Sequence, residues 1–218
     1  MGLRSIEMID TTTLAPFALA SALLVLIPGP AVMYIVSTGI SRGRRAAIAS
    51  VLGIETGAIV HVVAAAIGVS AIVASSAIAF SVLKYAGAAY LLYLGWKALT
   101  AGDAPLSAAA APEVSAWRAY GRGVLVNALN PKVALFFLAF IPQFVRPGRG
   151  AVPMQFLVLG AIFIAVAFVI DLAYAMTSGA IGGLVARSPR FAAAQRKFAG
   201  FAYLALGTSA ALTGQGSK

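Results

Sequence analysis

Six long apolar stretches constrain this chain more than any other feature of its sequence. Each is about 20 residues or longer, the length that an α-helix needs to cross a bilayer. They cover approximately residues 13–38, 46–74, 78–99, 119–145, 153–178 and 196–214. Hydrophobic residues make up 61% of the chain and charged residues 10%, whereas soluble domains contain about 25% charged residues. We therefore predict an all-α, polytopic membrane protein of six transmembrane helices.

The distribution of basic residues favours one orientation in the membrane. If both termini lie outside, ten of the 16 Lys and Arg fall on the cytoplasmic side, five fall on the outer side, and Lys132 lies within a span. Cytoplasmic loops of membrane proteins carry an excess of basic residues. The net charge of +10 is therefore attributed to these loops, and no nucleic-acid partner is predicted.

The third and sixth apolar stretches share a motif. Residues 84–91 read KYAGAAYL and residues 197–204 read KFAGFAYL, with six of eight positions identical. In the first and fourth stretches, Ile27-Pro28-Gly29-Pro30 is likewise matched with Leu129-Asn130-Pro131-Lys132. A unit of three spans places its second copy upside down in the membrane. The sequence therefore predicts two inverted three-helix repeats, residues 1–99 and 119–218, joined by a cytoplasmic Ala/Pro-rich linker at 100–118.

Prolines interrupt the first and fourth spans at these matched places. A proline inside a helix removes one backbone donor, and in lipid the freed carbonyl needs a partner from protein or water. Interruptions at corresponding places of two repeats indicate a transporter's binding site; the alternative is a pair of structural kinks. The predicted substrate-binding residues are Pro28, Gly29, Pro30, Asn127, Asn130, Pro131 and Lys132.

Three residues that can take up or release a proton lie inside spans, where such groups are costly and often functional. Asp171 shares a helical face with small residues, which predicts that it faces packed helices rather than lipid. His61 lies on a stripe of small residues formed by Gly53, Gly57, Ala64 and Gly68, and either a proton relay or a neutral packing role remains open for it. Glu55 lies off that stripe and nearer the cytoplasmic end, so either coupling or a position at the membrane interface remains open. The predicted proton-coupling residues are Asp171, His61 and Glu55.

Lys132 is the one basic residue well inside a span. Three interpretations stay open for it. Its ammonium group could pair with Asp171, meet a substrate carboxylate, or extend toward the cytoplasmic surface. An amino-acid zwitterion would need partners of both signs. Asp171 and the carbonyls freed at the breaks would suit its ammonium group, and Asn130 or Lys132 would suit its carboxylate.

The order and spacing of several motifs resemble the lysine exporter superfamily (LysE/RhtB), with the homoserine/threonine resistance branch closest. The motifs are Pro28-Gly29-Pro30, Arg42-Gly43-x-Arg45, Gly53-Ile54-x-x-Gly57 with His61, Lys84-x-x-Gly87-x-x-Tyr90-Leu91 with Gly95, and Asn130-Pro131-Lys132. The resemblance covers about residues 14–210. It implies six helices in a bacterial inner (plasma) membrane and efflux of amino acids or derivatives by proton exchange. Glu55 departs from the family pattern, in which this position is small or apolar, so its role and the identity of the substrate stay open.

An enzyme is a weaker interpretation of the same sequence. A hydrolase needs a serine and a histidine within reach of each other, but His61 and Ser70 are separated by about 13 Å of helical rise. Asp171 is the single intramembrane Asp, and the chain has no Cys and one His. We therefore predict no catalytic residues, no metal site and no cofactor. The predicted partners are a small-molecule substrate and the lipid bilayer, and a homo-oligomer is left open. The alternative function is a channel or structural membrane subunit without coupled transport.

Overall fold

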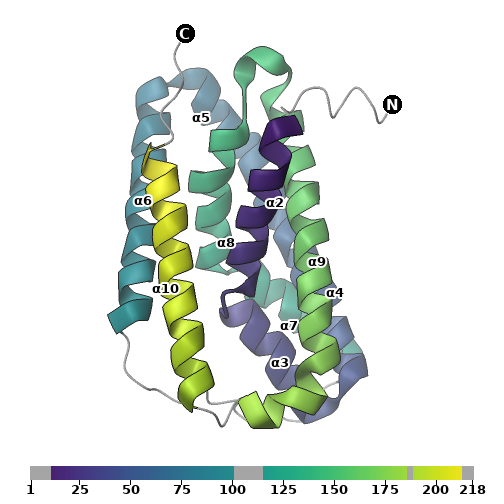
Figure 1. Ribbon diagram of the computed structural model, residues 1–218. Coiled ribbons are helices and arrows are strands. Elements are labelled where there is room, and N and C mark those ends of the chain that lie inside the picture. Colours follow the sequence, from purple (N-terminus) through teal and green to yellow (C-terminus); the bar gives the residue numbers. More distant parts are fainter. Residues whose placement is uncertain (1–10, 101–114, 186–188, 213–218) are drawn as a thin grey trace.

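The structure is a computed structural model that describes residues 11–100, 115–185 and 189–212, and every regular element in these ranges is helical (Figure 1). Most of the predicted linker lies outside the described residues. The α-helices are α2 (Thr11–Leu26), α3 (Pro30–Arg42), α4 (Arg44–Ala64), α5 (Ser70–Ser75), α6 (Ala77–Thr100), α7 (Ala116–Ala128), α8 (Pro131–Leu135), α9 (Val152–Val185) and α10 (Pro189–Leu212). The π-helical turns are η1 (Ala65–Val69) and η2 (Phe136–Phe140), and the 3₁₀ turns are η3 (Ile141–Phe144) and η4 (Pro147–Arg149).

Up to five membrane spans can be recognised among the described helices. Three helical segments are long and apolar enough by themselves: Arg44–Ile72, Ile78–Thr100 and Val152–Ser178. Two more spans result if each bent pair counts as one, with a bend of 54° between α2 and α3 and of 43° between α7 and the helix that starts at Pro131. These five match the first five predicted spans. The sixth stays a prediction, because α10, which carries Arg196 and Lys197 in its first half, is not among the helices that meet the same test.

The two breaks form because a proline begins a new helix at each of them. Pro30 and Pro131 occupy the first helical position of α3 and α8, where a proline costs the new helix no hydrogen bond and its fixed φ suits that helix. Gly29 and Asn130 are the N-cap residues that precede them. Both breaks thus share one local pattern, an N-cap residue followed by a proline that begins the next helix. The predicted alignment of the two repeats placed Pro30 opposite Lys132, one residue away from the match of Pro30 with Pro131 that this shared pattern favours.

Helices α4 and α7 approach each other closely through glycines. A Cβ atom on Gly57 would lie 2.5 Å from the carbonyl oxygen of Val124, and one on Gly123 would lie 2.6 Å from that of Ser50. The predicted small-residue stripe on α4 is thus confirmed from Gly53 to His61. Its continuation is not, since Ala64 and Gly68 are exposed. The reason is that α7 ends at Ala128, beside His61, and covers α4 no further.

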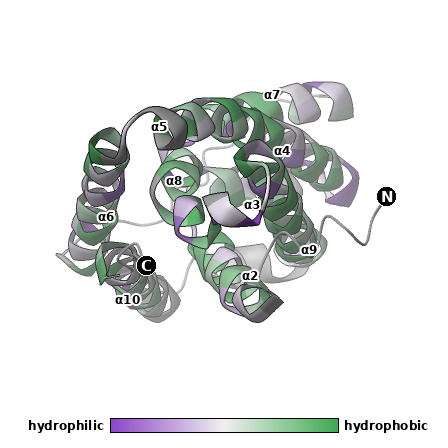
Figure 2. Cartoon of the chain, turned by 90° about the horizontal axis from the view of Figure 1, so that it is seen from above, coloured by the Kyte–Doolittle hydropathy of each residue, from purple (hydrophilic) through white to green (hydrophobic). Residues whose placement is uncertain are grey.

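One half of each broken span lies at the centre of the bundle. Seen from above, α3 and α8 lie inside a ring formed by α2, α4, α9 and the pair α6–α10 (Figure 2). Helices α6 and α10 run in opposite directions and pack through glycines, with Gly95 against Leu204 and Gly207 against Leu92. Large apolar side chains such as Ile67, Ile78 and Val169 remain exposed on the outside. This is the surface expected where lipid is the solvent.

Candidate functional site

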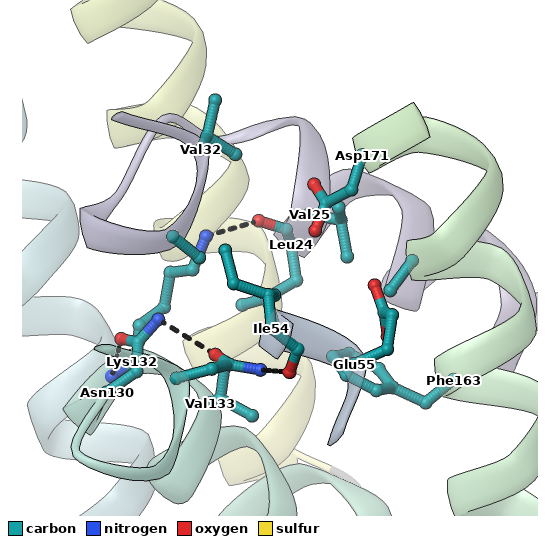
Figure 3. Close-up of a pocket in the computed structure, with 13 residues that line it drawn as sticks. Leu24, Val25, Val32, Ile54, Glu55, Asn130, Lys132, Val133, Phe163 and Asp171 are labelled. Atoms are coloured by element: carbon teal, nitrogen blue, oxygen red, sulfur yellow. Dashed lines mark hydrogen bonds between the residues drawn. The ribbon is translucent and has the colours of Figure 1, made fainter. Parts of the chain in front are cut away.

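A small cavity lies where the two broken spans meet, and six helices contribute to its walls (Figure 3). Its volume is about 20 Å³, roughly the space of one water molecule and too little for an amino acid. The site must therefore widen before it can hold an amino acid. The lining residues are Leu24, Val25, Ala31, Val32, Ile54, Glu55, Asn127, Asn130, Lys132, Val133, Phe163, Ala167 and Asp171.

Each proline at the breaks leaves one backbone carbonyl without its helical donor, because the N–H four residues further along is missing. Pro28 leaves the oxygen of Leu24 in this position, Pro30 leaves that of Leu26, and Pro131 leaves that of Asn127. In the structure, a side chain from another helix meets each of these three oxygens: Lys132, Tyr174 and His61 respectively. The oxygens of Leu24 and Asn127 also accept from the N–H three residues further along, that of Ile27 at 3.3 Å and that of Asn130 at 3.0 Å. The breaks are therefore tolerated because side chains and these tighter backbone bonds together replace the missing hydrogen bonds.

Lys132 is buried, and its ammonium group is bound to the end of α2. Its Nζ donates to the oxygens of Leu24 at 3.0 Å and Ile27 at 2.8 Å. Gly29 makes room for this arrangement, because a Cβ atom there would lie 3.3 Å from both Cε and Nζ of Lys132. The prediction that Lys132 extends toward the cytoplasmic surface was wrong. No salt bridge joins it to Asp171 within the part of the chain that the structure describes. Its ammonium group instead binds backbone carbonyls at the break, which were not among its predicted partners.

Two asparagines fix the second break. The side chain of Asn127 donates to the oxygen of Ile54 at 2.7 Å, which ties the end of α7 to α4. The side-chain oxygen of Asn130 accepts from the backbone N–H of Lys132 at 3.1 Å and so caps α8. The two side chains also meet each other, with a distance of 3.4 Å from Nδ2 of Asn130 to Oδ1 of Asn127. Together they hold Lys132 at the cavity.

His61 supports the second break from outside the cavity. Its Nε2 lies 2.8 Å from the oxygen of Asn127. Because a carbonyl can only accept, this nitrogen must carry the hydrogen. The ring also stacks on Phe137 at a centroid distance of 6.2 Å. These contacts agree with the packing interpretation of His61, and its part in proton transfer stays a prediction.

Glu55 and Asp171 place two carboxyl groups in the same cavity, one from α4 and one from α9 (Figure 3). They are 7% and 3% exposed. Both oxygens of Glu55 and Oδ1 of Asp171 are buried without a hydrogen-bond partner. A buried carboxylate without a partner is costly, so these groups require a proton or a bound cation. Burial of Asp171 against helices was predicted; a position of Glu55 at the membrane interface was wrong.

The start of α3 adds a positive end to the cavity. Ala31 and Val32, in its first turn, line the cavity. Gly29 offers this helix no side-chain cap. The first N–H groups of a helix lack partners within the helix and carry a partial positive charge. The cavity therefore combines a negative side, formed by Glu55 and Asp171, with a positive end.

Comparison with known proteins identifies the family. Residues 22–214 match the family described as LysE type translocator. A homoserine/homoserine lactone efflux protein of Salmonella typhimurium is 35% identical over 194 residues, which cover 88% of this chain and 92% of that protein. The chain belongs to the LysE family. Other LysE-like relatives are an uncharacterized membrane protein of Vibrio cholerae, 33% identical over 195 residues (88% and 92% covered), and a leucine efflux protein of Salmonella choleraesuis, 28% identical over 165 residues (75% and 77% covered). No solved structure matches the chain.

Membership of the LysE family confirms the resemblance seen in the sequence. The family consists of translocators, and relatives of this chain are named for efflux of homoserine and of leucine. This LysE-family chain is thus a membrane protein of a bacterial efflux family and not an enzyme. Its own substrate and coupling are treated below as proposals.

The structure of this LysE-family protein brings only part of the predicted set to the cavity. Asn127, Asn130, Lys132, Glu55 and Asp171 line it. Pro28, Gly29, Pro30 and Pro131 do not, and act through the carbonyls that they free and the space that they leave.

Sequence reasoning missed Tyr174, whose hydroxyl donates to the oxygen of Leu26 at 3.1 Å. Two signals were available for it. Tyr174 lies three residues after Asp171 and so shares its helix face, and Pro30 marks the oxygen of Leu26 as an acceptor in need of a donor.

Proposed function

We propose that this protein exports amino acids or related small zwitterionic metabolites from the cytoplasm, across the bacterial inner membrane, in exchange for protons. The observation that carries the proposal is the cavity at the two helix breaks, which has unpartnered carboxyl groups on one side and an uncapped helix start at another. The names of the homoserine and leucine efflux relatives support the same substrate class.

An amino acid fits the charges around the cavity once the cavity has opened. Its ammonium group would bind between Glu55 and Asp171, where both oxygens of Glu55 and Oδ1 of Asp171 lack hydrogen-bond partners. Its carboxylate would bind at the start of α3, near Ala31 and Val32, where free N–H groups and the helix dipole favour an anion. An ammonium group has three donors, and Lys132 uses two of them on α2. The third is available to the same carboxylate.

Exchange with protons follows from the carboxyl pair. When the substrate leaves, its ammonium group no longer compensates the negative charge of Glu55 and Asp171. Protons entering from the outside would then neutralise these groups, and the site could return closed and empty. Loss of the protons to the cytoplasm would prepare the site for the next substrate. This cycle couples export to the inward flow of protons.

Two inverted repeats would let such a site open alternately to each side. The packing of the helices supports this arrangement. The first span packs on α9 and the fourth packs on α4, and α6 packs on α10. If the two halves are exchanged, the pair formed by the first span and α9 becomes the pair formed by the fourth span and α4. The pair α6–α10 is unchanged by the exchange. We further propose that both termini lie outside, so that α3 and α7 form the cytoplasmic halves of the broken spans.

Metabolite profiling of the medium, from cells with and without the protein, identifies the exported compounds. The purified protein in liposomes should then show saturable exchange of that compound, and a pH gradient should drive its uphill movement. Conduction without saturation or exchange would instead indicate a channel.

The carboxyl mechanism is tested with Asp171→Asn, which should insert normally and lose most of the exchange. Asp103→Asn, the same substitution in the linker, is the matched control and should keep it. A normal exchange rate in Asp171→Asn would exclude this carboxyl group from the mechanism.

A further inference from the structure

Side-chain hydrogen bonds join the two broken spans at two places, one toward their α2–α8 end and one toward their α3–α7 end. At the α2–α8 end, Phe17 also packs on Phe136 and Phe144. In Figure 1, α2 and α8 form the upper halves of these spans, and α3 and α7 form the lower halves. On the upper side, the ammonium group of Lys132 at the start of α8 binds the carbonyls of Leu24 on α2 and of Ile27 just after it. On the lower side, the hydroxyl of Tyr34 on α3 donates to the oxygen of Ala119 on α7 at 2.9 Å.

Both contacts connect the first half of the chain to the second. Lys132 and Leu24 are 108 residues apart, and Tyr34 and Ala119 are 85 residues apart. A cavity of about 20 Å³ lies between them. A substrate can enter or leave only if the half-helices on one side separate, and this separation must break the contact on that side. In this structure both contacts are formed and the cavity is too small for an amino acid, as expected of a state between two openings.

We infer that Lys132 and Tyr34 are the residues that close the two gates of the transport path, an inference that rests on the proposed export function. Lys132 closes the α2–α8 side, which faces outward in the proposed orientation. Tyr34 closes the α3–α7 side, which faces the cytoplasm. Both act by positioning half-helices against each other.

The two gates differ in strength. The contact of Lys132 joins a buried, charged donor to two carbonyls, and hydrogen bonds of charged groups are the stronger kind. The contact of Tyr34 is one neutral hydrogen bond in a half-buried position. The cytoplasmic gate should therefore open more readily in the empty protein. An exporter needs this preference, because it must receive its substrate from the cytoplasm.

The register of the breaks explains why the gates differ. With Pro30 matched to Pro131, the counterpart of Lys132 in the first half is Ala31. Only the second half thus carries a long cationic side chain at this position. A symmetric pair of repeats has acquired two chemically different closures.

The absence of Cys from the chain allows a direct test. Ala167→Cys places one thiol on the cavity wall. Its labelling by a membrane-impermeant thiol reagent is measured without substrate in sealed vesicles of each orientation. Lys132→Met in this background should raise the rate from the outer side by about tenfold or more, and Tyr34→Phe should raise it from the cytoplasmic side by about two- to tenfold. The matched controls are Lys97→Met and Tyr93→Phe, which alter residues away from the cavity.

The inference is overturned if both variants label like their controls, or if both open the same side. Tyr34→Phe removes one oxygen atom and keeps the ring, so it tests the cytoplasmic gate even if Lys132→Met fails to insert. Lys132→Gln, which keeps a shorter neutral donor, then tests the outer gate. Export by the wild type is measured separately. If the wild type exports normally but the variants label like their controls, the gates alone are refuted. If the variants label as expected but the wild type exports nothing, the proposed function alone is refuted.

Discussion

Replacement of Gly123 by alanine should force α4 and α7 apart. Gly123 is buried on α7, and an added Cβ atom would lie 2.6 Å from the oxygen of Ser50 and 3.2 Å from the nitrogen of Ile54. Ordinary contact begins at 3.4 Å, so the nearest atom must retreat by 3.4 − 2.6, or 0.8 Å. Both neighbours are backbone atoms and cannot rotate away, which leaves a separation of the two helices as the response.

Gly121 on the same helix provides the matched control. A Cβ atom there meets nothing within 4 Å. Both substitutions gain the same helix propensity, about 1 kcal/mol for alanine over glycine. The difference between the variants therefore isolates the overpacking cost, which is about 1–3 kcal/mol in closely packed interiors. We expect Gly123→Ala to be less stable than Gly121→Ala by that amount.

Both purified variants are heated in the same detergent, and thermal unfolding is monitored by the fraction of protein that remains monodisperse at each temperature. Gly123→Ala should lose its fold at a clearly lower temperature, and Gly121→Ala should match or exceed the wild type. Export should fall as well in Gly123→Ala, because Asn127 lies one turn further along α7 and holds Ile54 and His61. Equal unfolding temperatures for the two variants would refute the close approach of α4 and α7.

Two further predictions concern the second break and the orientation. Asn130→Ala removes the cap of α8, worth about 0.5–2 kcal/mol, and should slow export. Asn130→Ser keeps a capping oxygen and should retain most of the rate, as should Pro16→Ala, which alters α2 away from the break; equal rates for the alanine and serine variants would show that capping is irrelevant. Reporter fusions after residues 45, 110 and 190 should all report the cytoplasm, and an external signal at 110 would overturn the proposed orientation.

Local patterns in the sequence were sufficient for several features of the fold and the site. Hydropathy located the five spans that the structure supports, and the prolines located both breaks. The small residues around Asp171 predicted that it faces other helices, and it is 3% exposed. These inferences succeed because apolar length, proline chemistry and helical periodicity depend on residues within a few turns of one another.

The partners of the site residues required the tertiary structure. The sequence offered Lys132 a carboxyl group or the membrane surface, but its ammonium group binds carbonyls more than 100 residues away. Glu55 lies off the small-residue stripe of α4, yet α9 brings Asp171 to the same cavity.

These contacts depend on which helices pack side by side in the folded protein. A lysine stem is long and flexible, and periodicity gives the face of a helix but not the neighbour that covers it. The sequence by itself determined that this chain is a helical membrane protein with two broken spans and charged groups inside them. Only the packing of α2, α4, α8 and α9 around one point decided that those groups form a single site, because that assembly depends on contacts between residues far apart in the chain.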